Sequence, residues 1–131
     1  MTQNEKELLL KDLCARLPYG IKLHCSSNVM TCIGPYTLNT IVLDRIFNDN
    51  TEYVPFDEFK PYLFPMSSMT EEQKDEFNAQ SLKLQLQVID DKIMYEKATE
   101  FEVDFYNKHH LDWRGLIPMG LAIDATGLNI Y

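Results

Sequence analysis

The stretch of this chain that is richest in side chains capable of chemistry is residues 107–120, Asn-Lys-His-His-Leu-Asp-Trp-Arg-Gly-Leu-Ile-Pro-Met-Gly. It contains two of the three histidines, the single tryptophan and one of the three arginines. Loops held by a rigid scaffold carry binding and catalytic residues disproportionately. We therefore select five side chains as the candidate ligand-binding or partner-binding residues: His109, His110, Asp112, Trp113 and Arg114.

The two adjacent histidines do not form a recognised metal motif. Neighbours on a helix point about 100° apart, so His109 and His110 cannot present the i, i+4 pair that zinc hydrolases use. A protonated histidine is favoured at a helix C-terminus, so one ring can act as a half-buried cap while the other is solvated. A metal site would need Asp112 and the distant His24 as further ligands, and no spacing brings them together. We expect no bound metal and no cofactor.

The Trp-Arg pair in this block has two interpretations. In the structural one, Trp113 fills the core and Arg114 pairs with a carboxylate or caps backbone carbonyls. In the functional one, the pair forms a binding surface, because Trp and Arg are enriched at hot spots and Arg can clamp an anion. Elsewhere, His24 and Cys25 face opposite sides of a predicted strand and cannot act as base and nucleophile. No GxSxG, P-loop, GxGxxG or HExxH motif occurs.

Length and composition predict one globular domain over residues 1–131. The hydrophobic fraction of 45% and the charged fraction of 24% are close to globular averages. No apolar run approaches the roughly 20 residues that span a bilayer. The polar, acidic start, Met-Thr-Gln-Asn-Glu-Lys-Glu, does not resemble a secretory signal. We expect a cytoplasmic protein without membrane association.

The net charge of −8 is concentrated in the middle of the chain. Residues 49–104 carry fourteen acids and five lysines, whereas residues 1–48 have a charge of +1 and residues 105–131 are neutral. Acidic surfaces repel phosphate backbones, so direct nucleic-acid binding is disfavoured. The acid excess is either a solubilising surface or a surface for a basic partner, such as a protein that normally binds DNA or RNA.

The three cysteines show no CxxC spacing. Their odd number and irregular separation argue against a disulfide framework or a structural zinc site. We predict that Cys14, Cys25 and Cys32 are reduced, buried thiols on apolar faces.

The N-terminal half is predicted to form a helix and an antiparallel sheet. Thr2 and Glu5 have capping-box spacing before a helix over residues 3–16, whose apolar stripe is Leu9, Leu10, Leu13, Cys14 and Leu17. A two-residue turn at Ser27-Asn28 would start a hairpin that pairs Leu23 with Cys32, Cys25 with Met30 and Ile21 with Gly34. A third strand is predicted at about Leu38–Phe47.

The C-terminal half is predicted to be mainly helical. Residues 53–65 indicate an irregular segment whose five aromatic rings either complete the core or form an exposed docking patch. Ser68 with Glu71, or Thr70 with Gln73, can cap a following helix. Residues 81–94 fit strand and helix periodicity alike, and side-chain propensity favours helix. A last helix over residues 96–109 and a short strand at 121–123 complete the chain.

The predicted fold class is α+β, with a small antiparallel sheet and two or three packed helices. Its expected core consists of Leu9, Leu13, Leu23, Cys32, Ile41, Leu43, Phe101 and Phe105.

Three segments resemble a family of small uncharacterised proteins encoded by anaerobic gut bacteria and their prophages. These segments are Asp12–Gly20, Tyr62–Glu72 and Phe105–Ala122. The family has no known activity, so it supplies no catalytic residues. What the resemblance implies is a bacterial cytoplasm and a mobile-element origin.

Two functions remain open at this point. The first is a non-enzymatic protein-binding or accessory module, based on the acidic middle, the aromatic segment, the Trp-Arg loop and the lack of a catalytic motif. The alternative is a small enzyme or anionic-ligand-binding protein with a polar site around His109, His110, Asp112 and Arg114.

Overall fold

The computed structural model describes residues 2–26, 28–37, 40–44, 51–86 and 91–131, and the side chains of all of these except 33–53 and 83–99. It confirms the α+β class. The helices and strands, in chain order, are α1 (Gln3–Arg16), β1 (Lys22–Cys25), β2 (Asn28–Thr37), β3 (Thr40–Asp44), β4 (Thr51–Pro55), β5 (Phe59–Leu63), α2 (Glu71–Leu86), α3 (Asp91–Lys108) and β6 (Ile123–Asp124).

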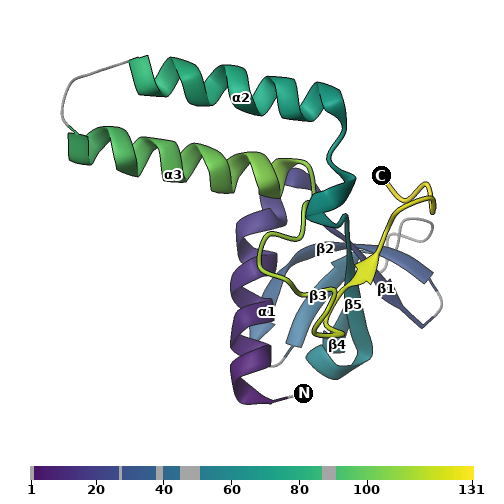
Figure 1. Cartoon of the computed structure of the whole chain (residues 1–131). Helices are drawn as coiled ribbons and strands as arrows, with labels where there is room; N and C mark the ends of the chain where they lie inside the picture. The colour runs from purple at the N-terminus through teal and green to yellow at the C-terminus, as the bar shows by residue number, and fades with distance from the viewer. Residues whose placement is uncertain (1, 27, 38–39, 45–50, 87–90) are drawn as a thin grey trace.

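The sheet has the strand order β4-β3-β2-β1-β5-β6. Neighbouring strands are antiparallel except for β6, which runs parallel to β5. Helix α1 packs along this sheet, and the α2–α3 hairpin extends away from it (Figure 1). The predicted terminal strand exists, but it is Ile123–Asp124 rather than 121–123.

Helix α1 has the predicted bounds and the predicted cap. The Glu5 N–H donates to Thr2 Oγ1 at 3.1 Å. Its buried face, however, consists of Leu9, Asp12, Leu13 and Arg16. The apolar stripe was therefore placed too far around the helix, and Cys14 is exposed, contrary to the prediction. The reason is that Asp12 and Arg16, which form a buried ion pair, flank Leu9 and Leu13 on the side away from Cys14, so the buried face is rotated away from Cys14.

The β1–β2 hairpin sorts its side chains as predicted but with a different register. Leu23 lies opposite Met30 and Cys25 opposite Asn28, and Ser26, which follows β1, has φ +49°. The predicted pairing of Leu23 with Cys32 is wrong by two residues. Because side chains alternate with period two, an even shift keeps every residue on its predicted face. Cys25 and Cys32 are accordingly both buried.

The prediction of an irregular segment over residues 53–65 is wrong. This region contains the end of β4, a short turn and all of β5, with Pro61 opposite Leu23 of β1. Pairing with β6 begins only at Tyr62, so the missing N–H of Pro61 interrupts no bond to that strand. Three of the five aromatic rings, on Phe56, Phe59 and Tyr62, are buried. These three rings complete the core and do not form a docking patch. Of the other two rings, Phe64 is half-buried, and the side chain of Tyr53 lies outside the described residues.

Residues 71–86 and 91–108 form two helices, which confirms the helical interpretation of residues 81–86 and 91–94, whereas residues 87–90 lie outside the described residues. The Gln73 N–H donates to Thr70 Oγ1 at 3.1 Å, and the Thr70 N–H donates to Gln73 Oε1 at 3.0 Å, a complete capping box. Helix α3 begins at Asp91, five residues before the predicted position 96. The two helices are held together by Phe77, whose ring packs on Phe101, Phe105 and Tyr106 at centroid distances of 5.6, 5.3 and 5.7 Å.

The buried core agrees with most of the prediction. Leu9, Leu13, Leu23, Cys32 and Phe105 are buried, whereas Phe101 is half-buried. The side chains of Ile41 and Leu43 lie outside the described residues. No helix in the described part of the chain is long and apolar enough to cross a membrane.

Candidate functional site

The residues selected from the sequence lie at the point where α3 meets the end of β5. His110 has φ +58°, so the chain leaves the helix there. The Phe64 N–H donates to the His110 carbonyl and the Asp112 N–H donates to the Phe64 carbonyl, both at 2.8 Å. Leu111 thereby forms a parallel bridge to Phe64. The block is thus bonded to the sheet instead of forming a free loop.

His109 is turned toward the start of α2. Its Nδ1 lies 3.3 Å from Gln73 Nε2, and its Nε2 lies 3.9 Å from a carboxylate oxygen of Glu76. Gln73 Oε1 already accepts the Thr70 N–H, so the amide NH2 group of Gln73 faces the ring. Nδ1 must then accept, which assigns the proton of the neutral ring to Nε2. Burial lowers the pKa of His109, against an opposing effect of Glu76.

His110 is turned to the opposite side. Its ring stacks on Tyr131, with centroids 3.7 Å apart and an interplanar angle of 14°. Its Nδ1 is buried and has no hydrogen-bond partner among the described residues. Burial lowers the pKa of His110 to about 4, and the nearby charges of Arg16, His109 and Lys22 lower it in the same direction. The ring is therefore neutral near pH 7.

Both carboxylate oxygens of Asp112 accept hydrogen bonds from the loop that follows it. Its Oδ1 accepts the Leu116 N–H at 2.7 Å and its Oδ2 accepts the Ile117 N–H at 2.8 Å. The side chain is buried. A carboxylate with two backbone donors on its two oxygens caps a turn, and this role leaves little capacity for a metal or a substrate.

Trp113 is also held from within the molecule. Its Nε1–H donates to Oδ1 of the buried Asn107 at 3.0 Å. The Arg114 guanidinium lies over the indole ring, 4.2 Å from its centroid. Trp113 is half-buried and is not among the buried core residues, so its predicted place in the core is wrong. The predicted pairing of Arg114 with a carboxylate agrees with the structure, since Arg114 Nε lies near Asp12.

Arg114 belongs to a buried ion cluster, which we define as Asp12, Arg16 and Arg114. Arg16 Nε donates to Asp12 Oδ2 at 2.9 Å, and neither side chain has any exposed surface. Arg16 Nη2 also donates to the Leu111 carbonyl at 2.7 Å. Arg114 Nε lies 3.5 Å from the other oxygen of Asp12. The cluster fixes the 107–120 block to α1, with two guanidinium groups sharing one carboxylate.

The five selected side chains therefore do not converge on one pocket. His109 lines a cavity of about 200 Å³ together with Phe64, Ser68, Thr70, Gln73, Leu111, Thr126 and Gly127. None of the other four selected residues lines it. In the part of the chain that the structure describes, no group of three His, Cys, Asp or Glu side chains could hold a metal ion.

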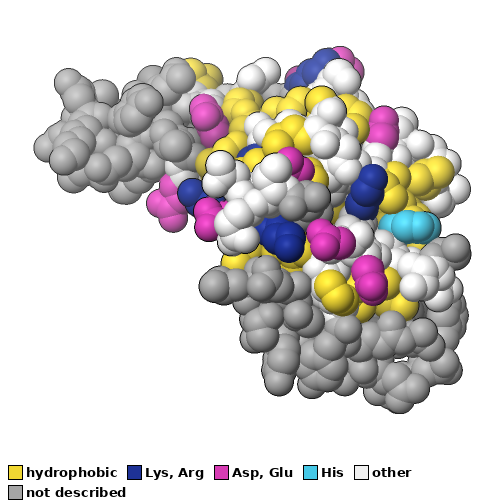
Figure 2. Space-filling model, turned by 90° about the horizontal axis from the view of Figure 1, so that it is seen from below, with side chains coloured by type: hydrophobic (Ala, Val, Ile, Leu, Met, Phe, Trp, Pro, Cys, Tyr) yellow, Lys and Arg dark blue, Asp and Glu magenta, His cyan; other side chains and the backbone are white. Residues whose placement is uncertain are grey.

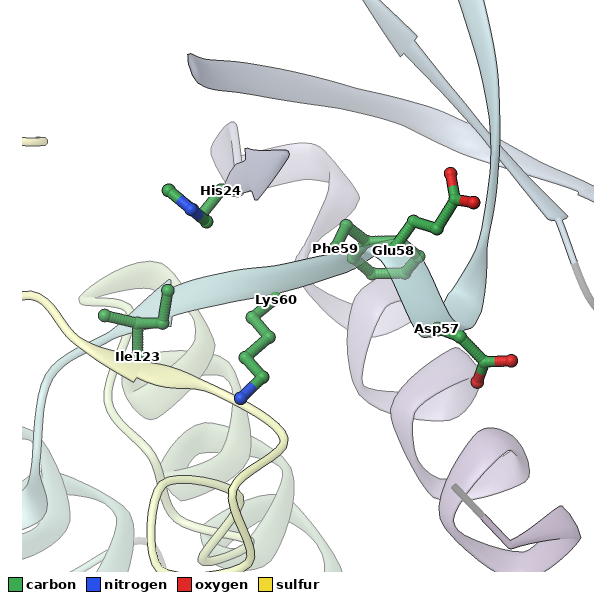
Figure 3. Close-up of a pocket in the computed structure, with 6 residues that line it drawn as sticks. All are labelled: His24, Asp57, Glu58, Phe59, Lys60 and Ile123. Carbon is green, nitrogen blue, oxygen red and sulfur yellow. The ribbon is translucent and has the colours of Figure 1, made fainter. Parts of the chain in front are cut away.

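A second hollow lies over the sheet, with a volume of about 360 Å³. It is lined by His24, Asp57, Glu58, Phe59, Lys60 and Ile123. His24 Nδ1 lies 2.9 Å from the Tyr62 hydroxyl, which fixes the orientation of the ring. In Figure 3, Asp57 and Glu58 point away from His24, and Lys60 extends toward the C-terminal segment. The charged groups do not face a common point, so this hollow is not a preformed site for an ion.

Sequence reasoning missed two structural features of this region. Asp12 and Arg16 stand four residues apart on the face that also carries Leu9 and Leu13, and this spacing is a readable signal for a buried pair. The contact of His110 with Tyr131, at the far end of the chain, had no local signal.

The first half of α2 carries an exposed, mainly acidic surface. Glu71, Glu72, Asp75 and Glu76 are all exposed, and Lys74 is the one basic residue among them. Lys74 Nζ pairs with Glu71 Oε1 at 3.2 Å, but both side chains are at least half exposed, so the pair is screened by water. By contrast, the face in Figure 2 shows basic and acidic side chains intermixed.

Comparison of the chain with models of known protein families, with curated proteins and with solved structures found no match.

Proposed function

We propose that this chain is a non-enzymatic protein-binding module that contacts a basic partner through the α2–α3 hairpin. The observation that carries the proposal is the acidic, exposed first half of α2 on a hairpin that extends from the sheet (Figure 1). As part of the same proposal, the partner is a protein of the bacterial cytoplasm, and the module is of mobile-element origin.

The charge of the hairpin supports a basic partner. Residues 71–108 contain ten acids and five lysines, a net charge of −5. Opposite charge on a partner would accelerate association and reject acidic competitors. A basic protein that normally binds a nucleic acid has the required surface.

The shape of the hairpin supports a protein rather than a small ligand. Within residues 71–82 most side chains are exposed, and Phe77 packs on α3. Leu82 exposes 56% of its surface and provides an apolar contact beside the acidic turns. A convex helix with one apolar residue among charges suits a partner groove.

The alternative function, an enzyme or an anion-binding site around His109, His110, Asp112 and Arg114, has less support. Each of these side chains has a separate internal partner, and Arg114 faces Asp12. No specific observation favours it.

The test is affinity capture followed by a binding titration. A captured partner should be basic, and its Kd should rise steeply with salt. The double variant Glu72→Gln, Asp75→Asn should weaken binding by roughly tenfold, a loss within the range of close charge pairs at interfaces. The matched control is Asp57→Asn, Glu58→Gln, which removes the same charge from another exposed segment and should leave Kd unchanged. Equal effects of both variants, or no stoichiometric partner at several salt concentrations, would contradict the proposal.

A further inference from the structure

The hydroxyl of Tyr131 occupies a position between two strands of the sheet. The Lys22 N–H of β1 donates to this hydroxyl at 3.0 Å, and the hydroxyl donates to the Tyr62 carbonyl of β5 at 2.8 Å. Leu23 lies opposite Pro61, so continuing the observed register by one residue would place Lys22 opposite Tyr62. The phenol thus replaces a direct backbone bond between the two strands with two bonds through one oxygen.

The ring of Tyr131 packs against residues from other elements, while 40% of the surface of Tyr131 stays exposed. His110 stacks on it, and Phe64 lies beside it at a centroid distance of 5.8 Å. Lys22 Nζ lies 5.8 Å from the ring centroid and donates to the Ile130 carbonyl at 2.8 Å. We call Lys22, Tyr62, Phe64 and His110 the tyrosine slot. It contacts three parts of its occupant: the hydroxyl, the ring and the preceding carbonyl.

The chemistry of the slot selects a phenol. The occupant must accept from one backbone N–H and donate to one backbone carbonyl through the same atom. A phenol hydroxyl does both, whereas a phenylalanine ring would remove both bonds and leave the part-buried Tyr62 carbonyl without its protein donor. A site built to bond a hydroxyl rejects the analogue that lacks it far more strongly than an apolar pocket rejects a small change in size.

The occupant is held by a segment with few other attachments. Residues 126–129, which lead to Tyr131, are all exposed. The segment is fixed at its start by the Ala125 N–H, which donates to the Leu63 carbonyl at 2.8 Å. The slot residues belong to β1, β5 and the segments that follow β5 and α3, and all of these precede residues 126–131 in the chain.

We propose that the tyrosine slot is a binding site for a tyrosine in an extended peptide segment, filled within this chain by Tyr131 and open to exchange with a tyrosine of a partner protein. The partner segment would place a backbone carbonyl one residue before its tyrosine, where Lys22 Nζ binds Ile130. This site is separate from the acidic surface of α2 and does not rest on the function proposed for it.

The direct test empties the slot and refills it. In the variant Tyr131→Ala, N-acetyl-tyrosinamide should bind, raise the Tm and shift the amide resonance of Lys22. N-acetyl-phenylalaninamide should bind at least tenfold more weakly, and the wild-type protein should bind neither compound. Equal binding of the two amides, or no binding of either to the folded variant, would overturn the proposal.

A second variant keeps the test decisive if Tyr131→Ala does not fold. Tyr131→Phe retains the ring but removes the bridging oxygen, so hydrogen exchange of the Lys22 amide should accelerate by at least tenfold. Exchange in α1 should stay as in the wild type. The control Leu128→Ala, at an exposed position of the same segment, should change neither the exchange rate of the Lys22 amide nor the exchange rates in α1. Unchanged exchange at Lys22 in Tyr131→Phe, or acceleration spread equally over α1, would overturn the proposal.

Discussion

The block at residues 109–114 and the first half of α2 both concentrate ionisable side chains, but they use them in opposite ways. In the block, Asp112 and Arg114 face backbone donors or a buried carboxylate inside the molecule. In α2, Glu72 and Asp75 are exposed. Chemistry-bearing residue types that cluster in a sequence therefore mark a folding junction as readily as a functional site, and exposure and partners separate the two.

The buried ion cluster should show the largest effect of any single substitution in this comparison. Asp12→Ala leaves Arg16 buried without a countercharge, so the free energy of unfolding should fall by about 3–5 kcal/mol. Urea denaturation measures it. The control Asp57→Ala, at an exposed position, should change it by less than about 0.5 kcal/mol. A loss below about 1 kcal/mol for Asp12→Ala would show that water reaches the cluster.

The apolar part of the same α1 face should show the next largest effect. Leu13 is buried against the sheet, and Leu13→Ala should cost about 2–5 kcal/mol through lost burial and a residual cavity. The same denaturation experiment applies. If the cost is under about 0.5 kcal/mol, the buried face of α1 is assigned incorrectly.

Titration of His110 should produce a smaller, pH-dependent effect. Its pKa is about 4 in the folded protein and about 6.5 in an unfolded chain. The unfolded state therefore binds more protons between these values, and stability present above pH 6.5 is lost as the pH falls toward 4. The loss should be about 1–3 kcal/mol after allowance for solvent screening at this partly exposed ring.

The control for this titration is His110→Asn, because asparagine tolerates the left-handed backbone at this position. Its stability should depend less steeply on pH, with a residual slope of the same sign from His109, whose pKa is also lowered. A slope equal to that of the wild type would show that His110 is not the titrating group.

The acidic surface of α2 should contribute least to stability. The variant Glu72→Gln, Asp75→Asn removes two charges near the positive end of the helix dipole, so the cost should stay within about 1 kcal/mol. Thermal denaturation at low salt measures it. A cost above about 2 kcal/mol would mean that these acids are structural, like those of the block.

The sequence predicted the features that depend on neighbouring residues. The Thr2 cap, the Thr70–Gln73 capping box and the helix over 3–16 rest on contacts within four residues. The faces of the β1–β2 hairpin were also predictable, because side-chain alternation survives a two-residue error in register.

The features that failed depend on distant contacts or on an atypical strand. β5 contains Pro61, and a proline usually argues against a strand inside a sheet. Pro61 lies before the residues of β5 that pair with β6, so its missing N–H interrupts no bond to that strand. Arg16 reaches the Leu111 carbonyl across 95 residues, and Tyr131 reaches Lys22 across 109. No local pattern indicates which of several loops will supply such a partner. The block at residues 109–114 was selected for its residue types, but the internal partners of its side chains could not be foreseen, and whether it binds a ligand or a partner stays a prediction.

The most direct test of the proposed binding surface is the salt dependence of Kd for the captured partner. Kd is measured for three proteins: the wild type, the double variant Glu72→Gln, Asp75→Asn, and the single variant Trp113→Phe. We predict that Kd rises with salt for the wild type, rises less steeply for the α2 variant, and follows the wild type for Trp113→Phe. If Trp113→Phe weakens binding while the α2 variant binds normally, the block is the binding surface and the account is wrong.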